Sequence, residues 1–297
     1  PDSYIEYYHQ ESLASGLRIR EKLSLAVEDS IKALANGFLR HPANGELAQK
    51  LDDKQHDADS FYLHLLRMVY RLLFLMVTEE RKLVYPPRPD AATERLRNIY
   101  FAYYSIGRLR ELAEKKAFVD GRSHDLFEGL KTTFRLFEDA RYGSKLGISP
   151  LGSGIFAPNA LDILRKLQLD NDSLLAVIRN LTSFRNEQGQ RVRVNYSDLD
   201  VEEFGSVYEG LLEYQPVVDK HNGRWKFYFT QGSKRASSGS HYTPEELVKP
   251  LLNHCLDYVV EEKKQADNPE EALLSITVCD VSAGSGHILL SAARQIA

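Results

Sequence analysis

The chain has 297 residues, of which 43% are hydrophobic and 27% are charged, and its formal net charge is -4. This composition is typical of a soluble globular protein of two domains and excludes a disordered chain. The mild acidity excludes nucleic-acid binding through overall charge, so any DNA-binding face has to be a local basic patch. The two cysteines, Cys255 and Cys279, are too few for a disulfide framework or a four-ligand zinc site, which favours a reducing cytoplasm.

Both ends of the chain have the pattern of a cut polypeptide, and the first residues show no signal sequence. The first residues, PDSYIEYYHQ, lack the basic and apolar regions of a signal sequence and begin without Met. The last residues, SAARQIA, stop within a helical pattern. We therefore expect a piece of a longer polypeptide.

The most hydrophobic run covers residues 61–77 and reads FYLHLLRMVYRLLFLMV. His64, Arg67 and Arg71 interrupt it, and it is too short and too charged to span a bilayer. Its apolar residues recur three and four positions apart, which gives one wide apolar face. The run predicts a central core helix.

From its start to about residue 200 the sequence reads as one helix after another, with loops at residues 41–45, 85–89 and 142–156. The last of these is rich in glycine, as phosphate-binding loops are. No lysine with a Ser or Thr follows Gly154, and the sequence runs instead into a proline. We interpret it as a surface loop.

The pattern of the sequence changes near residue 200. Residues 202–214 have apolar side chains at helical spacing, and Asp198 or Asp200 can cap this amphipathic helix. Asn222 and Gly223 then form a strong hairpin turn signal.

That turn signal pairs residues 216–219 with the aromatic run 225–229. Small, polar and basic residues follow at 232–240. They predict a mobile linker loop.

The segment 239–248, GSHYTPEELV, carries the signals of a helix start. Thr243 is placed as the N-cap, Pro244 as the first helical residue, and Glu246 completes a capping box. The free N–H groups and positive dipole end of such a helix suit a ligand carboxylate, such as the methionine part of a cofactor. A helix cap without any ligand is the simpler interpretation. The predicted buried face of this helix consists of Leu247, Val248, Leu251, Leu252, Leu256 and Val259.

A β-branched run at 275–281, SITVCDV, precedes the turn SAGSG at 282–286 and a helical pattern at 287–296. This order predicts a β-loop-α unit. Glycine lets the backbone turn tightly and lets a nucleoside approach its N–H groups. The third glycine of a dinucleotide fold would fall at Leu289, and the P-loop lysine is missing, which argues against NAD and ATP. The predicted inner face of the helix consists of Ile288, Leu289, Ala292, Ala293 and Ile296.

Together, GSHYTPEELV and, some forty residues later, DVSAGSGHILLSAARQIA resemble the cofactor-binding motifs of adenine-N6 DNA methyltransferases, in this order. The second motif of that family usually reads Asp-Pro-Ala-Cys-Gly-Ser-Gly-His-Phe. The residues that match it are Asp280, Gly284, Ser285, Gly286 and His287. The residues that depart from it are Val281, Ser282 and Ala283.

The resemblance continues upstream, more loosely. FYLHLLRMVYRLLFLMVTEERKLV, YYSIGRLREL and VNYSDLDVEEFGSVYEGLLEYQP look like the helical region that precedes the methylase in single-chain, type IIG-like restriction-modification enzymes. The resemblance implies a mainly α-helical domain over residues 1–198. Over residues 199–239 it implies an amphipathic helix, a small β-hairpin and a basic linker loop. It implies the first β-loop-α part of a Rossmann-like α/β methyltransferase domain over residues 240–297.

The resemblance also implies a binding pocket for the cofactor S-adenosyl-L-methionine, with two walls formed by different segments of the chain. On the first wall, the methionine end would lie against Tyr242, Thr243 and Pro244. On the second wall, the floor under the nucleoside would consist of Asp280, Ser282, Gly284 and Gly286. His287 would open the helix above that floor.

The implied reaction is methyl transfer to the exocyclic amine of a flipped adenine in a specific sequence of double-stranded DNA. Its catalytic motif, Asn/Asp-Pro-Pro-Tyr/Phe, does not occur in these 297 residues. We therefore expect no catalytic residue and no metal site in this chain, and no methyl transfer by it alone.

Other interpretations remain open. The spacing Glu-x-Lys of a nuclease occurs at Glu80, Glu114 and Glu262, but in solvated helical charge runs, so chance is favoured. A parent protein that acts on RNA, on protein or on a small molecule is an alternative, because a glycine loop recognises only the cofactor. The helical part would be a DNA- or protein-interaction module if basic and aromatic groups gather on one face. The candidates for that face are Arg95, Arg97, Tyr100, Tyr103, Tyr104, Arg108 and Arg110.

Overall fold

The computed structural model describes residues 4–52, 58–115, 123–185, 189–197, 214–231, 243–284 and 286–297, and residues 199, 204, 205, 207, 210 and 211 between them. The chain divides into two compact units. The helical unit comprises residues 21–198 and 215–230, and the second unit comprises residues 1–20, 199–214 and 231–297.

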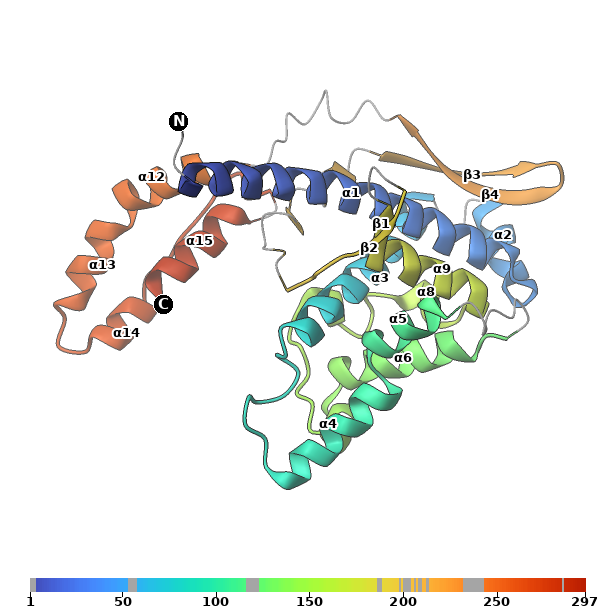
Figure 1. Ribbon diagram of the computed structural model, residues 1–297, viewed down its shortest axis with the longest axis horizontal. Helices are drawn as coiled ribbons and strands as arrows, with labels where there is room; N and C mark the ends of the chain where they lie inside the picture. Colours follow the sequence, from blue (N-terminus) through green and yellow to red (C-terminus); the bar gives the residue numbers. More distant parts are fainter. Residues whose placement is uncertain are drawn as a thin grey trace. The chain divides into compact units, whose positions relative to one another are not determined.

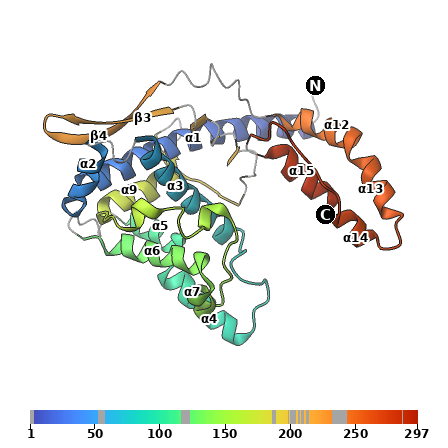
Figure 2. The same ribbon diagram turned by 180° about the vertical axis from the view of Figure 1, so that it is seen from behind.

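Helices dominate the described residues, as the sequence predicts (Figures 1 and 2). The α-helices up to residue 182 are α1 (Tyr4–Arg40), α2 (Gly45–Asp52), α3 (Ala58–Glu80), α4 (Ala91–Tyr103), α5 (Ile106–Glu114), α6 (Asp125–Glu138), α7 (Ala140–Gly143), α8 (Asp162–Arg165) and α9 (Asn171–Thr182). The 3-10 turns are η1 (Pro42–Asn44), η3 (Ser144–Leu146) and η4 (Gly154–Phe156).

Two small antiparallel sheets complete the helical part. β1 (Ser183–Arg185) pairs with β2 (Arg191–Arg193), with Phe184 opposite Val192. β3 (Tyr214–His221) pairs with β4 (Arg224–Gln231). The predicted hairpin is therefore confirmed, whereas β1 and β2 are too short to have been recognised in the sequence.

Helix α3 is the core of the helical unit. Phe61, Leu65, Met68 and Leu72 are fully buried and lie three or four residues apart on one face. The helix is 23 residues long, longer than the apolar run 61–77, and by length and composition it could cross a membrane. Its burial against α5, α8 and η4 shows that it is a core helix, as predicted.

Arg71 lies on α3 and is fully buried. Its Nε donates a hydrogen bond to the carbonyl oxygen of Ile155 (2.7 Å) and its Nη2 to that of Ala157 (3.1 Å). Its Nη1 pairs with the buried carboxylate of Glu138. Because these carbonyls belong to the end of the glycine-rich stretch, one core arginine holds that loop on the unit. The expected surface loop at 142–156 is present as short turns, with Phe156 buried at its end.

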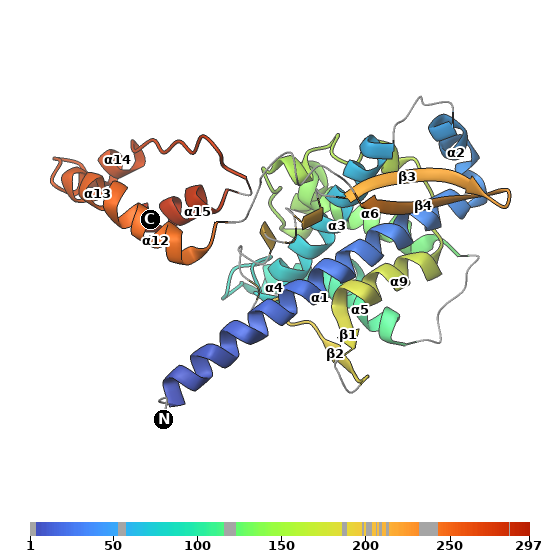
Figure 3. The same ribbon diagram turned by 90° about the horizontal axis from the view of Figure 1, so that it is seen from above.

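The β3–β4 hairpin is fixed to the helical core through residues within β4. The side chain of Asn36 on α1 bonds to both the N–H and the carbonyl oxygen of Phe227, each at 3.0 Å. The ring of Phe227 meets that of Phe61 edge to face, and the ring of Phe229 meets that of Tyr62 in the same way. The hairpin thereby belongs to the core although it lies far along the chain (Figure 3).

Two expected segments lie wholly or mostly outside the described residues. Of the helix predicted over 202–214, residues 204, 205, 207, 210 and 211 are described and helical. Tyr214 is the first residue of β3, so the predicted end of the helix is wrong. Its proposed caps, Asp198 and Asp200, and the linker loop 232–240 lie outside the described residues.

The substitution Arg71→Met tests the buried ion pair. Among the described residues, it leaves Glu138 with one cation, Arg165, whose side chain is 34% exposed, and it deprives two carbonyl oxygens of donors. Breaking a buried pair costs about 3–5 kcal/mol, so urea denaturation should show a loss of that size in the free energy of unfolding. Arg97→Met is the matched control, because its partner Glu94 is exposed and such pairs contribute about 1 kcal/mol or less. Equal losses in the two variants would contradict a structural role for Arg71.

Candidate functional site

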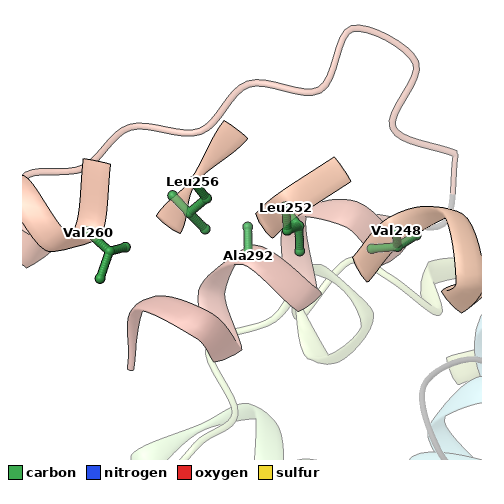
Figure 4. Packing of buried hydrophobic residues seen from close by; sticks show 5 residues of the cluster. All are labelled: Val248, Leu252, Leu256, Val260 and Ala292. Atoms are coloured by element: carbon green, nitrogen blue, oxygen red, sulfur yellow. The ribbon is translucent and has the colours of Figure 1, made fainter. Parts of the chain in front are cut away.

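The segment from residue 243 onward forms a small helical layer within the second unit. Its helices are α12 (Glu245–Cys255), α13 (Asp257–Lys264), α14 (Pro269–Leu274) and α15 (His287–Ile296). Their shared core consists of Val248, Leu252, Leu256, Val260 and Ala292, and Figure 4 shows Ala292 of α15 facing the side chains from α12 and α13. The two sequence motifs thus start two helices that pack on each other.

The buried face of α12 is narrower than predicted. Its buried residues follow a strict four-residue spacing, whereas Leu247 and Leu251 are 63% and 43% exposed. On α15, Ala293 is also exposed, contrary to the prediction. The reason is that α12 meets α15 along a single side, so only one row of side chains is covered.

Helix α12 begins one residue later than the capping box predicts. Pro244 is the N-cap, with extended backbone (ψ 149°), and its carbonyl oxygen accepts the bonds from Leu247 N and Val248 N. No side chain caps this end, so the expected box between Thr243 and Glu246 is wrong. The physical reason is that the carbonyl oxygen of Thr243 is in contact with a side chain outside α12.

That contact is made by His287, the first residue of α15. Its Nδ1 lies 2.9 Å from the carbonyl oxygen of Thr243, and its Nε2 lies 2.8 Å from Oε2 of Glu245. The ring is 9% exposed. Both ring nitrogens face oxygen atoms, so the ring bridges the Thr-Pro motif and the helix that follows the glycine motif. Sequence analysis overlooked Glu245, although a carboxylate two residues after Thr243 is a natural partner for a histidine.

The glycine-rich segment makes a tight turn before α15. Oδ1 of Asp280 accepts a hydrogen bond from Ser282 N (2.9 Å). Gly284 and Gly286 have positive φ angles of 51° and 83°, a region that favours glycine. A Cβ added to Gly286 would have no atom within 4 Å, so the backbone here is open to a ligand.

The β-branched run before this turn is not a strand. Residues 276–280 have no hydrogen-bonded neighbouring strand among the described residues, and Val278 is 39% exposed. A parallel strand gains its stability from strands far away in sequence, which local composition does not supply. The Rossmann-like part expected over residues 240–297 is therefore not seen among the described residues. Of the predicted strand, turn and helix, the turn and helix α15 are present and the strand is not.

The expected cofactor residues fall into two groups. Thr243, Pro244 and His287 meet at the start of α12. Asp280 and Ser282 bond to each other, and neither bonds to Thr243 or His287 among the described residues. The remaining expected residues are Gly284 and Gly286, which shape the turn, and Tyr242, which lies outside the described residues.

The nuclease candidate Glu80 has a structural role at the end of α3. Its carboxylate pairs with Arg110 and Arg193 and accepts a hydrogen bond from Tyr196 N (2.7 Å). These bonds lower the pKa of Glu80 against the opposing effect of burial. The expectation that Glu80 lies in a solvated charge run is therefore wrong: its side chain is 15% exposed, and its carboxylate holds α3, α5 and β2 together.

The basic and aromatic set from Arg95 to Arg110 does not form one face. Tyr100 is fully buried, and its hydroxyl donates a hydrogen bond to Glu79 (2.7 Å). Arg110 pairs with Glu80, whereas Tyr103 is 67% exposed. The set therefore divides into buried and exposed residues and does not present a single basic and aromatic surface.

The buried carboxylate of Glu79 caps α5. It accepts hydrogen bonds from Ile106 N (2.8 Å), Gly107 N (2.9 Å) and the hydroxyl of Tyr100. Burial raises the pKa of Glu79, and these three hydrogen bonds oppose that rise. The same burial, with Glu79 as neighbour, raises the pKa of Tyr100.

Comparison of the chain with known protein families, with curated proteins and with solved structures gives no match. The assignment of the site therefore depends on its own residues and geometry.

The substitution His287→Ala tests the bridge between the two motifs. It removes both ring contacts and should free the first turn of α12. Hydrogen exchange at the amides of Leu247 and Val248 should accelerate roughly tenfold, since a lost buried hydrogen bond costs about 1–3 kcal/mol. Leu290→Ala is the control on the same helix, because Leu290 is 42% exposed. Unchanged exchange in His287→Ala would contradict the bridge.

The raised pKa of Glu79 predicts a pH dependence of stability. A carboxyl whose pKa is higher in the folded than in the unfolded chain binds its proton more tightly when folded, so its contribution is largest at low pH. The wild type should therefore lose stability relative to Glu79→Gln as the pH rises above about 4.3. Tyr100→Phe removes one donor to the carboxylate and should shift this loss to higher pH. Urea titrations over a pH series measure both effects, and a pH-independent difference would contradict them.

Proposed function

We propose that this chain belongs to a DNA adenine-N6 methyltransferase of a restriction-modification system and that residues 243–287 form part of its pocket for S-adenosyl-L-methionine. The single observation that carries the proposal is the His287 bridge. Two motifs that resemble the family's cofactor motifs, far apart in sequence, meet through this ring at Thr243. A helix start beside a glycine turn suits a nucleoside cofactor with a charged tail: the free N–H groups of the helix face the tail, and the turn lets the nucleoside approach.

The residues present fit such a cofactor. The open backbone at Gly286 leaves room for a flat nucleoside beside the turn. The N-terminus of α15 has no side-chain cap, so its first N–H groups remain available to acceptor atoms of a ligand. Oδ1 of Asp280 is used by Ser282, which orients the carboxylate and leaves Oδ2 for a donor group of the ligand.

The bound cofactor would supply an electrophilic methyl group. The residues of this chain would hold and orient it: His287 and Glu245 would fix Thr243 against the amino-acid end, and the glycine turn would fix the nucleoside. The sequence has no Asn/Asp-Pro-Pro-Tyr/Phe motif to position an adenine amine, so this chain would bind the cofactor without transferring its methyl group.

Isothermal titration calorimetry with S-adenosylmethionine tests the pocket. Gly286→Ala should weaken binding about tenfold, because a left-handed conformation costs a residue with a Cβ roughly 1–2 kcal/mol. Gly189→Ala is a matched control: its φ is 75° and its Cβ position is also open, but it lies in the helical unit.

The outcomes separate the competing interpretations. Binding of S-adenosylmethionine in preference to ATP and NAD, weakened by Gly286→Ala and not by Gly189→Ala, supports the pocket. No heat with S-adenosylmethionine, or a preference for ATP or NAD, would contradict it. The adenine substrate is tested by reading the gene beyond the codon for Ala297. A reading frame that encodes Asn/Asp-Pro-Pro-Tyr/Phe there supports adenine as the substrate. A reading frame without that motif favours RNA, protein or a small molecule as the substrate.

A further inference from the structure

The free end of the β3–β4 hairpin carries a cluster of cations. Lys220, Arg224 and Lys226 are exposed around the turn. Among the described residues no carboxylate forms an ion pair with any of the three. The hairpin has one carboxylate, Asp219, whose Oδ2 accepts a hydrogen bond from the hydroxyl of Tyr228 (2.8 Å) and whose Oδ1 lies 2.8 Å from His221 Nε2. Among the described residues the three cations therefore have no carboxylate partner, and their mutual repulsion opposes their gathering beside one turn.

The cluster is held on a stiff support. Asn222 and Gly223 have φ angles of 52° and 76°, the values of a tight two-residue turn whose twist matches the strands. The ammonium group of Lys220 lies 4.8 Å from the centre of the Trp225 ring, a cation–π contact that limits its motion. In the middle of β4, Asn36 and the ring of Phe61 fix Phe227, and with it the ribbon, to the core. The cations are therefore presented in place before any partner binds.

The arrangement of the cations suits an extended polyanion that surrounds the turn. Side chains alternate along a strand, so Arg224 and Lys226 lie on one face of the ribbon and Trp225 on the other, with Lys220 stacked on it. A two-stranded β-ribbon fits the major groove of B-DNA, whose two walls are lined with phosphates. The chain has a net charge of -4, so a local cluster of this kind is what contact with DNA requires.

We propose that the hairpin turn, residues 219–226, binds duplex DNA through its phosphates, with Lys220, Arg224 and Lys226 as the contacting cations. This inference rests on the proposed action on DNA and places the DNA contact on the helical unit, apart from the cofactor residues. It also replaces the arginines of α4 and α5 as the candidate surface, because Arg97 and Arg110 are paired with carboxylates.

Fluorescence anisotropy with a fluorescein-labelled duplex of mixed sequence, titrated at several salt concentrations, tests the inference. Each phosphate contact contributes about 0.9 to the slope of log K against log salt concentration. The triple variant K220Q/R224Q/K226Q should therefore lower that slope by about 2–3 and weaken binding at low salt at least about tenfold. The charge-preserving variant K220R/R224K/K226R should retain the wild-type slope.

The matched control is R88Q/K115Q/K166Q, which removes the same charge from exposed positions of the helical unit that form no ion pair with any other described residue. Its slope should change by less than about one. Equal losses in the two triple variants, or no loss in the hairpin variant, would overturn the inference, as would a wild-type chain that does not bind the duplex. Because S-adenosylmethionine binding is measured separately on the same proteins, a failed hairpin test is distinguishable from a failed cofactor pocket. Circular dichroism of each variant confirms that it is folded.

Discussion

The burial of Arg71 is the constraint on which the helical unit depends. A guanidinium group that has lost all contact with water has to find acceptors and a counter-charge within the protein, or the fold loses several kcal/mol. Arg71 finds them in Glu138 at the end of α6 and in the carbonyl oxygens of Ile155 and Ala157. The rings of Phe134 and Phe156 lie about the guanidinium, at 5.2 and 5.1 Å from their centroids. One charge on α3 thus sets where α6 ends and where the glycine-rich loop returns to the core.

The same principle recurs at three other points of the molecule. A polar side chain satisfies the backbone of a segment far away in sequence: Asn36 holds β4 on α1, Glu79 caps α5, and His287 holds Thr243 at the start of α12. Each such bond is buried or nearly so, and a buried donor or acceptor without a partner costs more than a formed hydrogen bond contributes. These contacts therefore select one arrangement of elements whose apolar faces alone would allow several.

The proposed functions fall on different parts of the chain. The proposed cofactor residues lie in the second unit around His287, and the proposed DNA contact lies on the hairpin of the helical unit. Both proposed sites would present fixed polar groups to a charged ligand, the glycine turn to a nucleoside and the hairpin cations to phosphates.

Sequence alone determined the elements whose signals are local. The apolar period of α3, the Asn222-Gly223 turn and the helix after Gly286 are encoded within a few residues, and all three are present. Tertiary structure decided what depends on distant partners. The capping box predicted at Thr243 did not form. The carbonyl oxygen of Thr243 is in contact with His287, 44 residues away, and Pro244 is the N-cap instead. Residues 276–280 form no strand among the described residues, because β-branched side chains favour extended backbone but only a neighbouring strand can satisfy its N–H and carbonyl groups.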